Sequence, residues 1–180
     1  MNLILCAKKT AALVAASVSL AVLSACHSSH SAQFDAGEQT FPLKVAPYSA
    51  YLKQVERYIE KNRVFIGENT SKAQEIVMNM PFECGTQHKE TGVLLVHGLG
   101  DSPYFFHDVA TALCSEGIYV RTILLPGHGT KPGDMLSVSY EQWQTETNFH
   151  IELFSHEVKN LYVGGFSTGA NLTTIASFFR

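Results

Sequence analysis

Short apolar runs alternate with amphipathic segments along the chain from Gly92 onward. The run Val93 to Val96 has the composition of a parallel strand that is covered on both faces, and Tyr119 to Leu125 is predicted as a second strand. A third run spans Leu161 to Gly164. Because segments with one apolar face separate the runs, the pattern predicts an α/β protein with a mostly parallel sheet flanked by helices.

The helical segments carry signals at their ends. Ser102 and Pro103 are expected to begin one helix and Gly117 to end it. The apolar face of this helix would consist of Phe106, Val109, Ala110 and Leu113. Ser139 and Gln142 predict a capping box before a longer helix. The side chains of that helix expected to face inward are Trp143, Ile151, Phe154 and Val158.

A further amphipathic helix is predicted to start after Pro47. Its apolar residues recur at helical spacing: Tyr48, Tyr51, Leu52, Val55 and Ile59. Such a helix can pack on the protein or lie on a membrane surface. Its polar side mixes Lys53 and Lys61 with Glu56, and this lack of a basic face favours packing on the protein.

The first 25 residues have the order of an export signal. Lys8 and Lys9 precede an apolar run from Ala11 to Val22, and the sequence Leu-Ser-Ala-Cys follows and ends at Cys26. The run is shorter than the roughly 20 residues that a membrane-spanning helix needs. The sequence therefore predicts a cleaved signal peptide over residues 1–25.

The end of this signal resembles the bacterial lipobox, which implies that Cys26 carries a lipid anchor. An ordinary signal followed by a chance cysteine is the alternative. His27 stands where many lipoproteins retained in the inner membrane have aspartate. The expected location is therefore the bacterial cell envelope, lipid-anchored, with the periplasmic side of the outer membrane favoured. Residues 26–46 are polar and irregular and are expected to form a flexible tether.

Composition and charge narrow the classes of partner. The 180 residues suit one domain, and 46% hydrophobic with 16% charged residues suits a packed core. The formal charge is −3 for the whole chain and −5 without residues 1–25, which hold two lysines and no acidic residue. This balance argues against a nucleic-acid partner. Without Cys6 and Cys26, Cys84 and Cys114 remain, either paired as a disulfide or as two buried thiols.

The stretch Gly164 to Ala170, GGFSTGA, joins the third strand to a helix predicted over Ala170 to Phe179. The pattern GxSxG needs this context, because a tight turn holds the serine in strained backbone geometry. Gly165 and Gly169 occupy positions where side chains would clash. Ser167 is therefore a candidate nucleophile, and an incidental serine in a glycine-rich turn is the alternative.

Taken together, HGLGDSP after the first strand, PGHG after the second and GGFSTGA after the third resemble the α/β-hydrolase family. They look most like its carboxylesterase and monoacylglycerol lipase branch, over Gly92 to Arg180. The resemblance implies that Ser167 attacks an ester carbonyl and forms an acyl-serine, without metal or organic cofactor. It also implies an oxyanion hole made by the backbone amides of Leu99 and Thr168. The substrate would be a small-molecule or lipid ester.

A serine hydroxyl needs a base, and the resemblance implies the chain order serine, then aspartate or glutamate, then histidine. His97 and His128 are expected to shape loops, and the ten residues after Ala170 include no acid and no histidine. We therefore interpret residues 47–180 as the N-terminal part of an α/β-hydrolase domain, truncated after the nucleophile turn and inactive alone. A noncatalytic envelope lipoprotein that uses the same scaffold for binding is the alternative.

Overall fold

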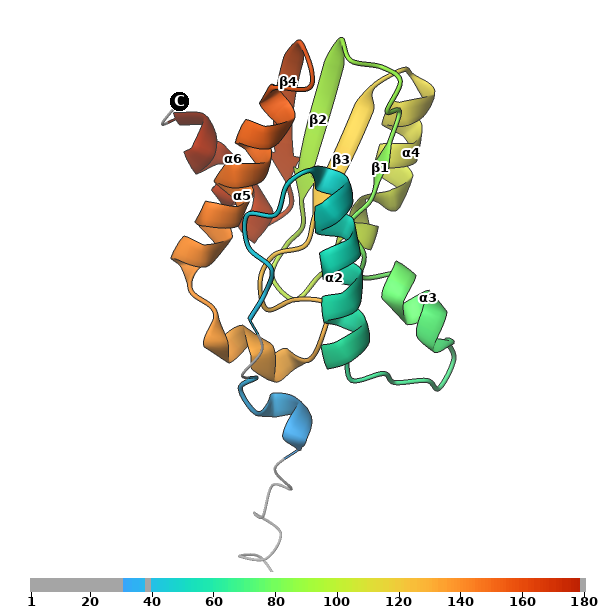
Figure 1. The fold of residues 1–180 in the computed structure, drawn as a ribbon, viewed down its shortest axis with the longest axis vertical. Helices are drawn as coiled ribbons and strands as arrows, with labels where there is room; N and C mark the ends of the chain where they lie inside the picture. The colour runs from blue at the N-terminus through green and yellow to red at the C-terminus, as the bar shows by residue number, and fades with distance from the viewer. Residues whose placement is uncertain (1–30, 38–39, 179–180) are drawn as a thin grey trace, which may run out of the picture. The chain divides into compact units, whose positions relative to one another are not determined.

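The computed structural model describes residues 31–37 and 40–178. The predicted signal peptide and the lipidation site Cys26 lie outside these residues. The described chain forms a four-stranded sheet in the order β1-β3-β2-β4, shown in Figure 1. The strands are β1 (Glu83–Cys84), β2 (Thr91–Val96), β3 (Tyr119–Ile123) and β4 (Asn160–Gly165). The predicted α/β class is confirmed: β2, β3 and β4 are parallel, and the short β1 pairs antiparallel with β3.

The register of the parallel strands brings three loops to one edge of the sheet. Val96 at the end of β2 pairs with Ile123 of β3 and with Gly165 of β4. The HGLGDSP, PGHG and GGFSTGA segments therefore begin side by side. This carboxyl edge is where open α/β sheets place their ligands.

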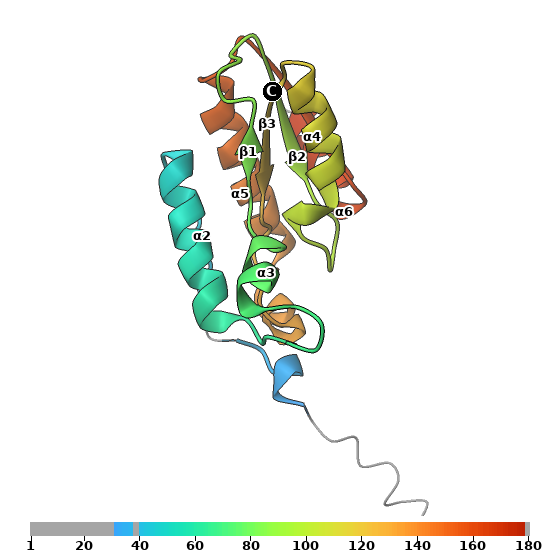
Figure 2. The same cartoon turned by 90° about the vertical axis from the view of Figure 1, so that its right-hand side faces the viewer.

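Helices cover both faces of the sheet. On one face, α5 (Tyr140–Ser155) and α6 (Thr168–Phe178) contribute Phe154 and Leu172 to a core that includes Leu94 of β2. On the other face, α4 (His107–Ser115) packs Ala110 against Leu95 and Val120. Figure 2 shows α5 and α4 on opposite sides of the strands.

Most predicted helix signals are confirmed, and three are wrong. Val158 lies beyond the end of α5 (Tyr140–Ser155), although it is buried in the same core. Ser139 and Gln142 form the expected capping box at the start of α5. Ser102 does not cap the next turn, the 3₁₀ helix η2 (Pro103–Phe106), because its hydroxyl donates to the Met78 carbonyl at 2.7 Å instead. Val109 is exposed, because α4 turns Ala110 rather than Val109 toward the sheet.

The predicted helix after Pro47 is α2 (Tyr48–Asn62), and it packs on the protein. Its buried face includes Tyr51, Val55 and Ile59, which contact Leu124 at the end of β3. The Tyr48 hydroxyl donates to the carbonyl of Thr122 at 2.7 Å. A short helix, α3 (Lys72–Val77), follows before β1. Figure 1 shows α2 on the same face of the sheet as α5. No helix within the described ranges is long and apolar enough to cross a bilayer.

Residues 40–46, which the sequence assigns to the tether, pack against the folded unit. Phe41 is only 7% exposed, and its ring meets Tyr58 edge-on at 5.2 Å between centroids. The backbone N–H of Lys44 donates to the buried carboxylate of Glu146 at 2.9 Å. The folded unit thus starts before Pro47, because one buried aromatic and one buried acceptor anchor a segment whose composition looks like a linker. Before it, a 3₁₀ turn, η1 (Ala32–Phe34), contacts η3 (Pro132–Ser137).

The structure joins Cys84 and Cys114 in a disulfide, with 6.0 Å between their Cα atoms. The bond links β1 to the C-terminal end of α4, 30 residues further along the chain. Of the two alternatives that the sequence left open, the structure adopts the pair.

Candidate active site

Ser167 lies in a sharp turn between β4 and α6. Its backbone φ is 51°, in the left-handed region that a non-glycine residue rarely occupies. The turn is held by the amide of Gly169, which donates to the Phe166 carbonyl at 2.9 Å. The amide of Asn171 donates to the carbonyl of Ser167 at 3.1 Å. Because Ser167 is exposed above the sheet, its hydroxyl is accessible to a ligand.

The two glycines flanking Ser167 allow this turn to sit on the sheet. A Cβ on Gly165 would lie 2.3 Å from the carbonyl carbon of Gly169, and one on Gly169 would lie 1.9 Å from the carbonyl oxygen of Val96. Side chains at either position would push α6 away from β2. The structure thus confirms the prediction that side chains at Gly165 and Gly169 would clash with neighbouring backbone atoms.

The loop after β2 contacts this turn directly. A Cβ on Gly98 would lie 3.4 Å from the Cβ of Ser167 and 3.3 Å from the Phe166 carbonyl oxygen. The next residue is Leu99, and the residue after Ser167 is Thr168. Within the described part of the chain, the amides of Leu99 and Thr168 donate to no protein acceptor. Thr168 also opens α6, where the helix dipole favours negative charge. The two amides expected to form the oxyanion hole therefore belong to adjoining segments and have no protein acceptor.

His97 is a structural residue of this loop. It is fully buried, its Nδ1 donates to the Gly98 carbonyl at 2.8 Å, and its Nε2 accepts from the Leu125 amide at 3.0 Å. Burial, together with the neighbouring His128, lowers the His97 pKa to about 3. The ring is therefore neutral and has no nitrogen to offer as a base to Ser167.

His128, from the PGHG segment, holds the same loop from the other side. Its Nε2 accepts from the amide of Gly100 at 3.2 Å, and its Nδ1 donates to the Pro126 carbonyl at 3.1 Å. Burial lowers its pKa below the ordinary histidine value. The ring meets that of His97 edge-on, 4.8 Å between centroids. The two imidazoles thus fix the loop on either side of Leu99.

An exposed apolar surface borders the turn, and we call Leu99, Phe105 and Phe166 the elbow shelf. All three are about half exposed. The rings of Phe105 and Phe166 stack at 4.6 Å between centroids and 27° between planes. Because Phe166 precedes Ser167 and Leu99 follows Gly98, hydrocarbon resting on the shelf would lie beside the serine.

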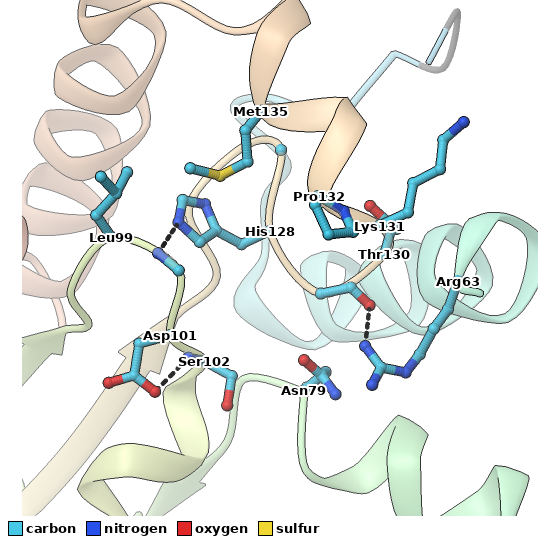
Figure 3. Close-up of a pocket in the computed structure, with 13 residues that line it drawn as sticks. Arg63, Asn79, Leu99, Asp101, Ser102, His128, Thr130, Lys131, Pro132 and Met135 are labelled. Atoms are coloured by element: carbon cyan, nitrogen blue, oxygen red, sulfur yellow. Dashed lines mark hydrogen bonds between the residues drawn. The ribbon is translucent and has the colours of Figure 1, made fainter. Parts of the chain in front are cut away.

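A cavity of about 650 Å³ opens beside the Leu99–Gly100 segment, and Leu99 of the elbow shelf is part of its lining. Figure 3 shows its walls, which come from the loops after β2 and β3 and from the α2–α3 region. Ser167 itself does not line it. The residues that sequence reasoning missed here are Arg63 and Asn79, since neither belongs to a motif. Across the described ranges, no three side chains of the metal-binding types gather as a metal site.

The parallel sheet, the strained serine turn and the adjoining loop together define an α/β hydrolase. Comparison with known families agrees, because residues 87–177 match the family described as serine aminopeptidase, S33. This match covers half of the chain, and the chain therefore belongs to that family of α/β hydrolases.

Two relatives are lipolytic enzymes. The chain is 32% identical over 82 residues to the thermostable monoacylglycerol lipase of Bacillus sp. (strain H-257). The aligned segment covers 46% of this chain and 33% of that protein. It also resembles a solved structure from a study of LipS and LipT, two metagenome-derived lipolytic enzymes. That similarity has a TM-score of 0.50 and 28% identity, and it covers 54% of this chain and 39% of the other. The chain thus spans about a third of the length of its curated relative.

Proposed function

We propose that the protein is a carboxylic ester hydrolase of the lipase and esterase type that uses Ser167 as its nucleophile. The observation that carries the proposal is the contact between the strained turn at Ser167 and the loop of Gly98. The amides of Leu99, next to Gly98, and of Thr168, next to Ser167, have no acceptor among the described residues, which supports their proposed role as oxyanion donors. Such donors stabilise the oxyanion that forms when an ester carbonyl is attacked.

In the proposed reaction, the Ser167 oxygen bonds to the carbonyl carbon while its proton passes to an imidazole base. The tetrahedral intermediate then expels the alcohol, which takes that proton, and leaves an acyl-serine. Water then attacks the acyl carbon while its proton passes to the imidazole; the bond to the Ser167 oxygen breaks, that oxygen takes the proton back, and the acid is released. No metal or organic cofactor takes part in this scheme.

The base and its carboxylate partner come, in our proposal, from outside the sequence printed here. Both ring nitrogens of His97 and of His128 are already hydrogen bonded. No aspartate, glutamate or histidine follows Ser167 in the sequence. The curated relative is about three times as long as the segment that matches.

A fluorophosphonate probe tests the nucleophile, because it phosphonylates an activated serine. We expect the native gene product to be labelled on the peptide that contains Ser167, with loss of labelling in Ser167→Ala. Ser115→Ala is the matched control, since Ser115 is an exposed serine on α4 away from the turn. A folded native protein that remains unlabelled would contradict the proposal and favour a noncatalytic binding role.

We further propose that the protein is anchored in the bacterial envelope by a lipid on Cys26, where lipid esters and exogenous esters are both accessible. The order of charged, apolar and small residues up to Cys26 supports this. Intact-mass measurement of the native protein tests it. The expected mass starts at a lipidated Cys26, and Cys26→Ala should remain unlipidated. A native protein that keeps residues 1–25, or starts at an unmodified residue, would overturn the proposal.

A further inference from the structure

Residues 63–79, which we call the α3 brace, contact both of the loops that meet beside Leu99. The brace begins at Arg63, directly after α2, and contains α3. It ends before residue 87, where the match with the hydrolase family starts. Its contacts with the two loops therefore lie outside what the family match explains.

The first of these loops carries His128 and has little conformational restriction of its own. His128 lies between Gly127 and Gly129, which have φ of 80° and 79°. Glycine adopts many backbone conformations, so contacts from other segments must fix the ring between them. The Trp143 indole provides one such contact before His128, because it donates to the Pro126 carbonyl at 2.8 Å.

One end of the α3 brace holds the same loop after His128. The Arg63 guanidinium donates through Nη1 to the Gly129 carbonyl at 3.1 Å, a contact that Figure 3 shows. The Val64 amide donates to the Thr130 carbonyl at 3.4 Å. These two bonds fix the backbone directly behind the imidazole.

The other end of the brace holds the HGLGDSP loop. The Ser102 hydroxyl donates to the Met78 carbonyl at 2.7 Å, three residues beyond Leu99. The two loops are also joined to each other, because the Gly100 amide donates to Nε2 of His128 at 3.2 Å. The brace and this bond thus enclose the segment whose Leu99 amide is the proposed oxyanion donor.

Glu75 of α3 fixes the orientation of Arg63. Its carboxylate is only 4% exposed and accepts from Arg63 Nε at 3.0 Å. The other carboxylate oxygen accepts from the amides of Gly67 and Ile66, at 3.0 and 3.1 Å. The Gly67 bond, together with the Arg63 guanidinium, holds the Glu75 pKa below its ordinary value. The ionised carboxylate forms a charge-assisted hydrogen bond, which holds the guanidinium in one orientation.

We propose that the α3 brace positions the oxyanion donor of Leu99, with Arg63 and Glu75 as its positioning residues. Arginine suits this role, because its planar fork can donate to a carboxylate and to a backbone carbonyl at once, whereas a lysine ammonium is a single point charge. Both residues act through the loop of His128 rather than on the reacting atoms. The assignment rests on the proposed ester hydrolysis at Ser167.

Amide hydrogen exchange of the ¹⁵N-labelled 180-residue chain tests the brace without any turnover. Arg63→Lys keeps a positive charge beside Glu75 and removes the fork. We expect the Gly100 amide to exchange about 10-fold faster in this variant, as expected when one hydrogen bond is weakened. The Phe166 amide, which donates to the Val96 carbonyl at 3.1 Å, should keep its exchange rate. A general loss of stability would instead accelerate both amides equally.

Two matched controls accompany this experiment. Arg57→Lys makes the same change at an exposed position of α2 and should leave the Gly100 amide unchanged. Ser102→Ala removes the other attachment of the brace and should also accelerate Gly100. Ser115→Ala is its control, because both hydroxyls donate to a backbone carbonyl at 2.7 Å but Ser115 does so within α4.

Labelling kinetics connect the brace to the chemistry at Ser167. With the native gene product and a fluorophosphonate probe, Arg63→Lys should lower the maximal labelling rate about 10-fold, because a small displacement of an oxyanion donor is costly. The probe concentration that gives half of this rate should change little. Arg57→Lys should alter neither quantity.

Several results would overturn the assignment. These are an unchanged Gly100 amide in Arg63→Lys, equal acceleration of Gly100 and Phe166, or a change in the half-saturating probe concentration alone, which would indicate that Arg63 binds the ligand. Labelling that Arg63→Lys does not slow would reject only the role of the brace. A folded native protein that is not labelled at all would reject the hydrolase proposal itself.

Discussion

At the scale of single residues, the site depends on backbone geometry more than on charged side chains. Ser167 has a φ of 51°, and its turn is compatible with the sheet only because Gly165 and Gly169 lack a Cβ. The two histidines near the turn are neutral scaffolding that position the amide of Leu99. Local sterics and buried hydrogen bonds therefore fix the backbone of the loops around Ser167.

Alanine substitutions at three neighbouring glycines should separate these steric effects. Gly165→Ala and Gly169→Ala place a Cβ within 2.3 Å and 1.9 Å of backbone atoms. Each should lower the free energy of unfolding by at least about 3 kcal/mol. Gly164→Ala is the matched control, because its Cβ would meet only Leu95 at 3.4 Å, and it should cost under about 1 kcal/mol. Urea unfolding measures all three, and equal losses would contradict the packing described for this turn.

Acid should destabilise the fold through His97. Its pKa is about 3 in the folded protein, whereas an exposed histidine has a pKa near 6.5, so the unfolded chain binds the extra proton between these values. The free energy of unfolding should therefore fall as the pH falls through this range, by roughly 2 kcal/mol at pH 5 from His97 alone. His128 acts in the same direction.

Urea unfolding at pH 7 and pH 5 measures this effect. The loss between the two pH values should shrink in His97→Gln and persist in His156→Gln, since His156 is an exposed residue beyond α5. An identical pH dependence in His97→Gln and the unmodified chain would show that His97 does not resist protonation.

At the scale of elements, segments outside the sheet are bound to it by a few long-range contacts. Residues 40–46 are attached through Phe41 and Lys44, and α2 through its tyrosines. The disulfide attaches the short β1 to α4. These contacts explain why a segment with the composition of a linker is part of the folded unit.

Removing the Phe41 ring should test this attachment. Phe41→Ala should lower the free energy of unfolding by about 3 kcal/mol, because the ring is buried against Tyr58 and its loss leaves a cavity. Phe34→Ala is the comparison, since that ring is 54% exposed and should cost under about 1 kcal/mol. Similar small losses of stability for both variants would support the sequence-based prediction that the flexible tether extends to residue 46.

Replacing both disulfide cysteines should lower stability by an amount set by the closed loop. For a sequence separation of 30 residues, loop-closure entropy corresponds to about 3–4 kcal/mol. We expect Cys84→Ser with Cys114→Ser to show this loss in urea unfolding under oxidising conditions. A reductant should destabilise the unmodified chain by a similar amount and leave the double variant unchanged. Insensitivity of the unmodified chain to reductant would contradict the pairing.

At the scale of the whole molecule, the proposed reaction at Ser167 needs a base, and the ring nitrogens of His97 and His128 are already hydrogen bonded in the loops. We predict that the 180-residue chain hydrolyses p-nitrophenyl butyrate no more than about 10³-fold faster than water, the residual effect of an oxyanion hole and binding. Ser167→Ala should change this rate little. Turnover at about 1 s⁻¹ or faster that disappears in Ser167→Ala would show that a base lies within these residues.

Patterns in the sequence were enough to predict the α/β class, the order of strands and helices after Gly92, the capping box of α5 and the sharp serine turn. These features depend on periodicity, capping and turn chemistry, which act between residues close together in the chain. The resemblance of three motifs then indicated the hydrolase family, which the comparisons confirm.

The remaining features could not be predicted in this way, because they depend on contacts between residues that are distant in sequence. Whether Cys84 meets Cys114, whether Phe41 is buried, and which atoms His97 and His128 bind are set by packing across the sheet. The cavity likewise forms only where Asn79 of the α2–α3 region meets the loop of Gly100. No local pattern encodes such a juxtaposition, since it arises when the sheet brings separate loops to one edge.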